Sequence, residues 1–193
     1  MKNIFLFVCV FVSLLSCNEK KINQKAQDLD KKATKIYIRN YSNTDSLKYS
    51  LSLVDSAIKL QDDHVNFYIT KTMVLNQLKK YDQVVDVYDK ILHFWKNNCL
   101  ILLAKGVSFE RLNKLDSAFH NYQLALKYLD KARFKDPKFK EYQKILLYGL
   151  LKDSINFNLS LQEFKTRFKN EKDFSYYYQD LINFDRINYI KSF

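Results

Sequence analysis

Apolar and polar positions recur along most of this chain at spacings of three and four, which is the pattern of amphipathic helices. The clearest stretch begins at Cys99 and contains two apolar faces, one centred on Gly106 and the other on Tyr122. A mainly polar break at residues 113–116 separates these faces, and Asp116 is of a type that caps helix starts. The pattern therefore predicts two antiparallel helices of about three turns each, joined as a helical hairpin.

The same pattern occurs three times, at a constant period of thirty-four residues and without gaps. Three unrelated hairpins in a helical bundle are the alternative, but such hairpins do not keep one register over eight positions. A fixed period of this size indicates a stacked solenoid, and solenoids serve mainly as binding surfaces. The eight matching positions in the third, second and first stretches are Leu102, Gly106, Phe109, Leu112, Leu115, Ala118, Tyr122 and Ala125; Tyr68, Thr72, Leu75, Leu78, Tyr81, Val84, Tyr88 and Ile91; and Thr34, Ile38, Tyr41, Thr44, Leu47, Ser50, Val54 and Ala57.

The order of small residue, aromatic, alanine, aromatic and alanine in the third stretch resembles the tetratricopeptide repeat (TPR). The third repeat fits this family best. The first repeat fits only in its second half, because Ile38 stands at the small-residue position of its first helix. Lys71 and Lys105 also depart from the family, which prefers an aliphatic residue at their position. The resemblance implies an all-α, right-handed α-solenoid of TPR-like helical hairpins, with repeats at residues 31–64, 65–98 and 99–132.

Residues 133–193 continue the helical pattern less regularly. Gly149 lies forty-three residues after Gly106, so we align the two glycines and place nine extra residues between the units. We expect a degenerate fourth hairpin and then one C-terminal capping helix, whose broad apolar face includes Phe184. The tyrosines at 176–178 have an alternative role as a partner-binding patch, but an array must cover its exposed end, which favours core or cap.

Residues 1–16 have the features of an export signal: Lys2 is followed by an apolar run of twelve residues, too short to span a bilayer. The end of this run, Leu14-Leu15-Ser16-Cys17, resembles the lipobox of bacterial lipoproteins, whose cysteine is lipidated and becomes the mature N-terminus. Cleavage without lipidation and an uncleaved anchor are the alternatives. Residues 17–30 are mostly polar, so we expect a tether or a frayed helix that holds the folded body at a membrane surface.

The residue after Cys17 and the remaining cysteines indicate where the protein is located. By the sorting rule of lipoproteins, Asn18 favours the outer membrane, so we expect a lipid-anchored protein of the bacterial cell envelope. With Cys9 in the signal and Cys17 lipidated, only Cys99 remains in the folded body, and no internal disulfide can form. We expect Cys99 to be a small buried apolar residue.

The chain is strongly basic, with a net charge of +11. Removing Lys2 with the signal leaves +10 on the mature chain. In a cytosolic protein this balance would suggest nucleic acid, but export argues against that partner. Acidic proteins and anionic envelope polymers remain as partners, and lysines on solvated helix faces are the simpler explanation.

The sequence lacks the patterns that accompany catalysis. Two glycines, at 106 and 149, are too few for a phosphate-binding loop or a glycine-flanked nucleophile. Asp62, Asp63 and His64 look metal-like in isolation, but they fall at a predicted turn between repeats, where polar residues are expected. We therefore predict that the chain is not an enzyme and has no catalytic residues, no metal site, no cofactor and no small-molecule substrate.

The predicted function is that of a membrane-anchored scaffold or adaptor, and the alternative is an immunity or inhibitor lipoprotein that neutralises a toxin. In TPR proteins the first helix of each repeat lines the partner-binding groove. Leu100 and Ala104 stand where a clamp for C-terminal carboxylates needs polar residues, so an apolar or amphipathic segment of an envelope protein is the expected partner. Transferred to this chain by position, the groove residues are Lys35, Arg39, Asn66, Ile69, Met73, Asn76, Leu103, Val107 and Glu110.

Overall fold

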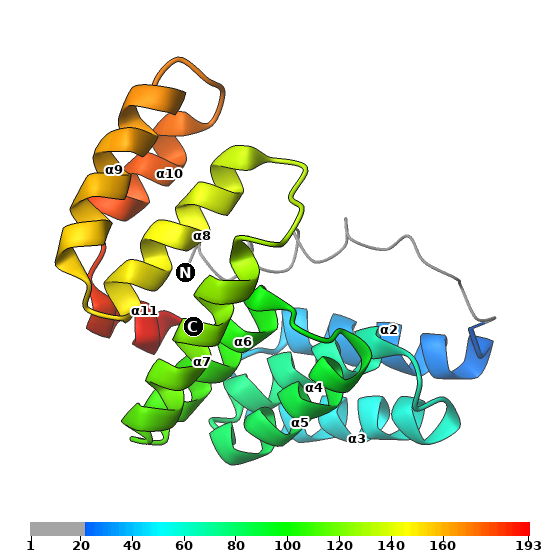
Figure 1. The fold of residues 1–193 in the computed structure, drawn as a ribbon. Helices are drawn as coiled ribbons and strands as arrows, with labels where there is room; N and C mark the ends of the chain where they lie inside the picture. The colour runs from blue at the N-terminus through cyan, green and yellow to red at the C-terminus, as the bar shows by residue number, and fades with distance from the viewer. Residues whose placement is uncertain (1–21) are drawn as a thin grey trace. The chain divides into compact units, whose positions relative to one another are not determined.

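The computed structural model of the chain describes residues 22–193, and within them it contains helices and no strands (Figure 1). The chain divides into two compact units, here called unit 1, up to Lys96, and unit 2, from Asn97. Consecutive helices pair as hairpins, α2 with α3 and α4 with α5 in unit 1, and α6 with α7 and α8 with α9 in unit 2. The helices are α2 (Gln24–Arg39), α3 (Thr44–Leu60), α4 (Val65–Gln77), α5 (Tyr81–Phe94), α6 (Cys99–Arg111), α7 (Leu115–Leu129), α8 (Pro137–Leu150), α9 (Ser154–Phe168), α10 (Phe174–Ile182) and α11 (Arg186–Ser192).

The period of the sequence is also the period of the helices in the second and third hairpins. The helices α4 and α6 begin at Val65 and Cys99, thirty-four residues apart, and α5 and α7 begin at Tyr81 and Leu115, at the same spacing. Spacings of three and four place the apolar residues of each helix on the side that meets its partner. The helical hairpin predicted for each of these stretches is therefore present.

One turn geometry joins the helices of three hairpins. Lys79, Asn113 and Lys152 have positive φ angles of 58°, 57° and 61°, and each lies two residues after the end of a first helix. The amide of the following residue donates in each case to the carbonyl five residues earlier, which is the Schellman arrangement that satisfies free carbonyls at a helix end. This shared turn defines the repeat register independently of the side chains.

The turn corrects the predicted alignment of the fourth hairpin. Lys152 follows Asn113 by thirty-nine residues, so the fourth hairpin is displaced by five residues from the period, and the prediction of nine is wrong. Gly149 is consequently not the counterpart of Gly106. A Cβ atom on Gly149 would lie 2.5 Å from the ring of Phe184, so this glycine makes room for a residue beyond α10.

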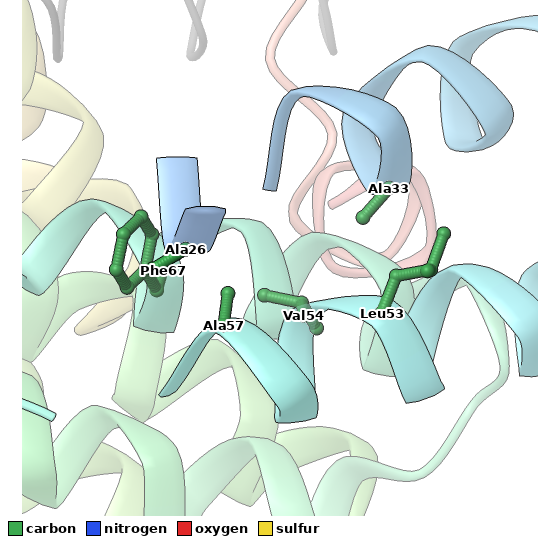
Figure 2. Packing of buried hydrophobic residues seen from close by; sticks show 6 residues of the cluster. All are labelled: Ala26, Ala33, Leu53, Val54, Ala57 and Phe67. Atoms are coloured by element: carbon green, nitrogen blue, oxygen red, sulfur yellow. The ribbon is translucent and has the colours of Figure 1, made fainter. Parts of the chain in front are cut away.

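Of the two alternatives for residues 17–30, the structure has the helix from Gln24 onward and not the tether, because α2 begins there. The side chain of Asn23 accepts a hydrogen bond from the Ala26 amide and caps the helix, and the Asn23 amide donates to Gln61 at 2.8 Å. Ala26 and Ala33 are fully buried, two helical turns apart, and they belong to a core cluster with residues of α3 and α4 (Figure 2). Their small side chains allow close helix packing, and this burial outweighs the polar character of the segment.

The predicted single capping helix consists of two helices. The helix α10 packs on α8 and α9, and its Tyr177 ring lies 5.1 Å from the Tyr142 ring of α8, as expected for a cap. The chain then breaks at residues 183–185, and Asp185 caps α11 by accepting a hydrogen bond from the Asn188 amide. Phe184 lies in this break, so it is not on the helical face predicted for it.

Two predictions about small residues are confirmed. Cys99 is buried, and burial raises the pKa of its thiol to about 11, so it stays protonated as an apolar core residue. Gly106 lies where α6 and α7 approach closely, because a Cβ atom there would be 2.5 Å from Cε1 of Tyr122.

No helix in residues 22–193 is long and apolar enough to cross a membrane. Cys17 and the predicted signal lie outside the described residues.

Candidate partner-binding face

Six of the nine predicted groove residues belong to two helices of unit 1 that contact each other directly, α2 and α4. Lys35 and Arg39 are exposed on α2, and the four residues on α4 are half-buried. Half-buried side chains next to exposed cations can contact a partner without first unfolding the unit. We call the surface formed by these six residues the unit 1 face: Lys35, Arg39, Asn66, Ile69, Met73 and Asn76.

The α2 side of this face contains a shallow hollow with a volume of about 330 Å³. Ile38 at its rim is 58% exposed, although the sequence pattern assigns it to packing. The reason is that α2 packs through Ala33, whose carbonyl accepts a hydrogen bond from the buried Ser50 hydroxyl of α3. Ile38 is therefore not the small packing residue that the repeat register predicts, and Ala33 packs against α3 instead. The hollow is lined by Asp30, Lys31, Thr34, Lys35, Ile38 and Arg39.

The structure also places Asp30 beside the unit 1 face, a residue that sequence reasoning missed. Its carboxylate forms a hydrogen bond with Thr70 of α4, which shows that this part of α2 faces α4. The missed signal was the pair of alanines at 26 and 33, which mark the packing side of α2 better than Ile38 does.

Polar acceptors on this face are only partly satisfied. Burial raises the pKa of the Asp30 carboxyl, while the hydrogen bond with Thr70 and the charge of His64 oppose this shift. Asp30 Oδ1 and Asn76 Oδ1 are both buried atoms without a hydrogen-bond partner. Unpaired buried acceptors of this kind destabilise the folded state. The accessible part of the face thus combines exposed cations with half-buried polar and apolar side chains.

The groove residues predicted in the third repeat do not lie on an accessible face. Leu103 and Val107 have no exposed surface, and the Glu110 side chain is 9% exposed and forms an ion pair with Arg186. One cause lies in the first half of α6, because a helix segment that is apolar on all sides is buried on all sides, and the other is α11, whose Arg186 covers Glu110. The run Cys99–Ala104 contains no polar side chain apart from its thiol, and this signal is visible in the sequence. The prediction for these three residues is wrong.

The described residues do not bring together the groups that a metal ion needs. No three histidine, cysteine, aspartate or glutamate side chains within residues 22–193 are grouped so that they could hold one.

Comparison with known proteins gives a likeness in fold. No protein-family model matches the chain, and no curated protein sequence matches it. Among solved structures, the chain is similar to MamA MSR-1 C2, a TPR-containing protein, with a TM-score of 0.50 and 16% sequence identity. The likeness covers 77% of this chain and 82% of that chain. Together with the helical hairpins, it confirms the predicted all-α, TPR-like solenoid fold.

Proposed function

We propose that this chain is a membrane-anchored scaffold of the bacterial cell envelope, which binds another protein on its unit 1 face. The observation that supports this proposal is the accessibility of that face on a TPR-like fold. The exposed Lys35 and Arg39 flank half-buried apolar side chains such as Ile69 and Met73. Binding, rather than catalysis, is the activity that this combination of side chains supports.

The chemistry of the face suggests an acidic, amphipathic partner segment. Three cations, Lys31, Lys35 and Arg39, line the hollow on α2, and Asp30 is the only carboxylate among its lining residues. Carboxylates on a partner would pair with these cations at the rim, where charges mainly set the association rate and the specificity. Apolar side chains of the same segment would then pack on the α4 side, around Ile69 and Met73.

Reversing two charges on this face is expected to abolish partner capture. Lys35→Glu with Arg39→Glu replaces attraction by repulsion while leaving the core of α2 unchanged, so the melting temperature should stay within a few degrees of the parent. Affinity purification from detergent-solubilised membranes, with quantification of the co-purified proteins, measures the loss, which we expect to be at least tenfold.

The matched control is Lys48→Glu with Lys59→Glu on α3, which changes the net charge equally within the same unit. Both lysines are exposed, so this variant should retain capture. If both double variants capture the same proteins in the same amounts as the parent, the unit 1 face is not the binding surface.

We further propose that Cys17 carries the lipid that anchors the chain, as its lipobox-like sequence suggests. Replacement by serine removes the thiol that accepts the lipid, so Cys17→Ser should move the protein from the membrane fraction to the soluble fraction or leave the precursor uncleaved. Metabolic labelling with an alkyne fatty acid measures the modification directly. Cys99→Ser is the control and should keep the label, because its thiol is buried. Absence of label in the parent protein would refute the lipid anchor.

A further inference from the structure

The C-terminal helix α11 is attached to α6 by ionic and hydrogen-bonding contacts at both of its ends. At its start, the Arg186 guanidinium meets Glu110 with two contacts, Nη1 to Oε1 at 2.5 Å and Nη2 to Oε2 at 2.8 Å. Arg186 Nε also donates to the Leu150 carbonyl at 3.0 Å. Paired contacts between guanidinium and carboxylate are geometrically specific. They therefore fix the position of α11 and also pair the charge of Arg186.

At the other end of α11, a second arginine belongs to α6. Arg111 donates through Nε to the Ile190 carbonyl at 2.9 Å and through Nη2 to the Lys191 carbonyl at 3.1 Å. These carbonyls belong to the last turn of α11, where helix carbonyls lack partners within the helix. The two adjacent residues Glu110 and Arg111 therefore bind the beginning and the end of one short helix.

The apolar part of this attachment rests on two neighbouring side chains of α11. Ile190 is buried, and the ring of the half-buried Tyr189 lies 5.7 Å from that of Phe184, whereas Ile187 is 60% exposed. A helix of this length is not stable in isolation, so its order depends on its contacts with the rest of unit 2. Short segments that depend on such contacts can open without global unfolding.

The position of this attachment on α6 corresponds to the unit 1 face. Glu110 follows Asn76 by thirty-four residues, one full repeat, and Asn76 belongs to that face on α4. In unit 2 the equivalent place is thus occupied by a helix of the same chain.

We propose that the C-terminal end of α6 is a second protein-binding surface and that α11 is its resident intramolecular ligand. The incoming partner is a short helix with an arginine in its first turn and an aliphatic residue four positions later, as in Arg186 and Ile190. Such a helix displaces α11 from Glu110 and Arg111. This surface is independent of the unit 1 face, because it lies on different helices and because its Glu110 carboxylate binds a cation.

A peptide exchange experiment on the full chain tests this proposal. The probe is a fluorescent peptide with the sequence of residues 184–193, titrated into the parent chain and into the Arg186→Gln chain. The substitution loosens the resident helix, so the peptide should bind the Arg186→Gln chain at least tenfold more tightly than the parent. A peptide that itself carries Arg186→Gln should bind neither chain.

Two variants serve as controls in the same titration. The Lys191→Gln chain has the same net charge as Arg186→Gln, and its substituted side chain is exposed, so it should behave as the parent does. Adding Glu110→Gln to the Arg186→Gln chain removes the carboxylate that receives the peptide, and it should weaken binding at least tenfold. Equal binding to all of these chains, or no binding to the Arg186→Gln chain, would overturn the proposal.

Hydrogen exchange on the parent chain provides a second measurement that needs no substitution. If α11 is a displaceable ligand, its amides should exchange at least a hundredfold faster than those of α8, and added peptide should accelerate them further. Exchange of α11 at the same rate as α8 would make it a fixed part of the fold and would overturn the proposal. This measurement also decides the matter if the Arg186→Gln chain does not fold.

Discussion

Replacing Leu103 by aspartate is expected to prevent unit 2 from folding, or to lower its free energy of unfolding by more than about 4 kcal/mol. Leu103 is one of the largest side chains in the chain without exposed surface. The substitution removes its apolar contacts and also places a carboxylate where neither water nor a cation can reach it. Urea denaturation followed by circular dichroism measures the loss.

The comparison with Met73→Asp makes this prediction specific to burial. Met73 and Leu103 are both first-helix residues of their repeats and were assigned to the same groove from the sequence, but Met73 is half-buried in the structure. Its replacement should change the free energy of unfolding by about 1 kcal/mol or less and should weaken partner capture. A Leu103→Asp chain that folds as stably as Met73→Asp would show that Leu103 is accessible.

Gly106→Leu is the second substitution with a large expected effect, a loss of about 3 kcal/mol or more through overpacking between α6 and α7. Even one added carbon meets the Tyr122 ring, at 2.5 Å from Cε1 and 2.6 Å from Cδ1, while the carbonyl of Ala118 lies 3.2 Å away. Tyr122 has no exposed surface and donates a hydrogen bond to Glu110, so its ring is poorly placed to move aside. Thermal and urea unfolding measure this loss.

A double-mutant cycle identifies the ring as the cause. Gly106→Ala should destabilise the parent chain, but in a Tyr122→Ala background its cost should vanish or reverse, since alanine favours a helix over glycine by about 1 kcal/mol. Lys131→Leu, at an exposed position, should change the stability by about 0.5 kcal/mol or less. An equal cost of Gly106→Ala in both backgrounds would place the conflict elsewhere, for example at the Ala118 carbonyl.

The second and third hairpins could be predicted closely because both the apolar spacing and the turn repeat in them without interruption. The start of α2 was missed for a physical reason: a polar segment can be helical if a few small residues allow close packing. Ala26 and Ala33 provide that packing here, and neither looks like a core residue in a segment rich in lysine, glutamine and aspartate. Repeat matching also gave weight to Ile38, which a strict register places in the core but which lies at the surface.

The division of the groove between accessible and buried residues was harder to predict. Periodicity tells which residues share a side of a helix, but exposure depends on what the rest of the chain places against that side. The attachment of α11 joins Arg186 to Glu110, which are seventy-six positions apart in the sequence. No local sequence pattern predicts this contact. A composition signal was nevertheless present, since residues 99–104 of α6 are apolar without interruption whereas α4 mixes polar and apolar positions.

The displaced register of the fourth hairpin has a practical consequence for labelling this protein. The extra residues lie largely in the connection between α7 and α8, where Arg133 is exposed. The start of the connection is held by Lys140, which donates to the carbonyls of Asp130 and Ala132, and its end by Phe134, whose ring lies 5.6 Å from that of Phe139. Exposed connections tolerate insertions. An epitope or a small fluorophore tag inserted beside Arg133 would therefore report on the chain without occupying either proposed binding surface.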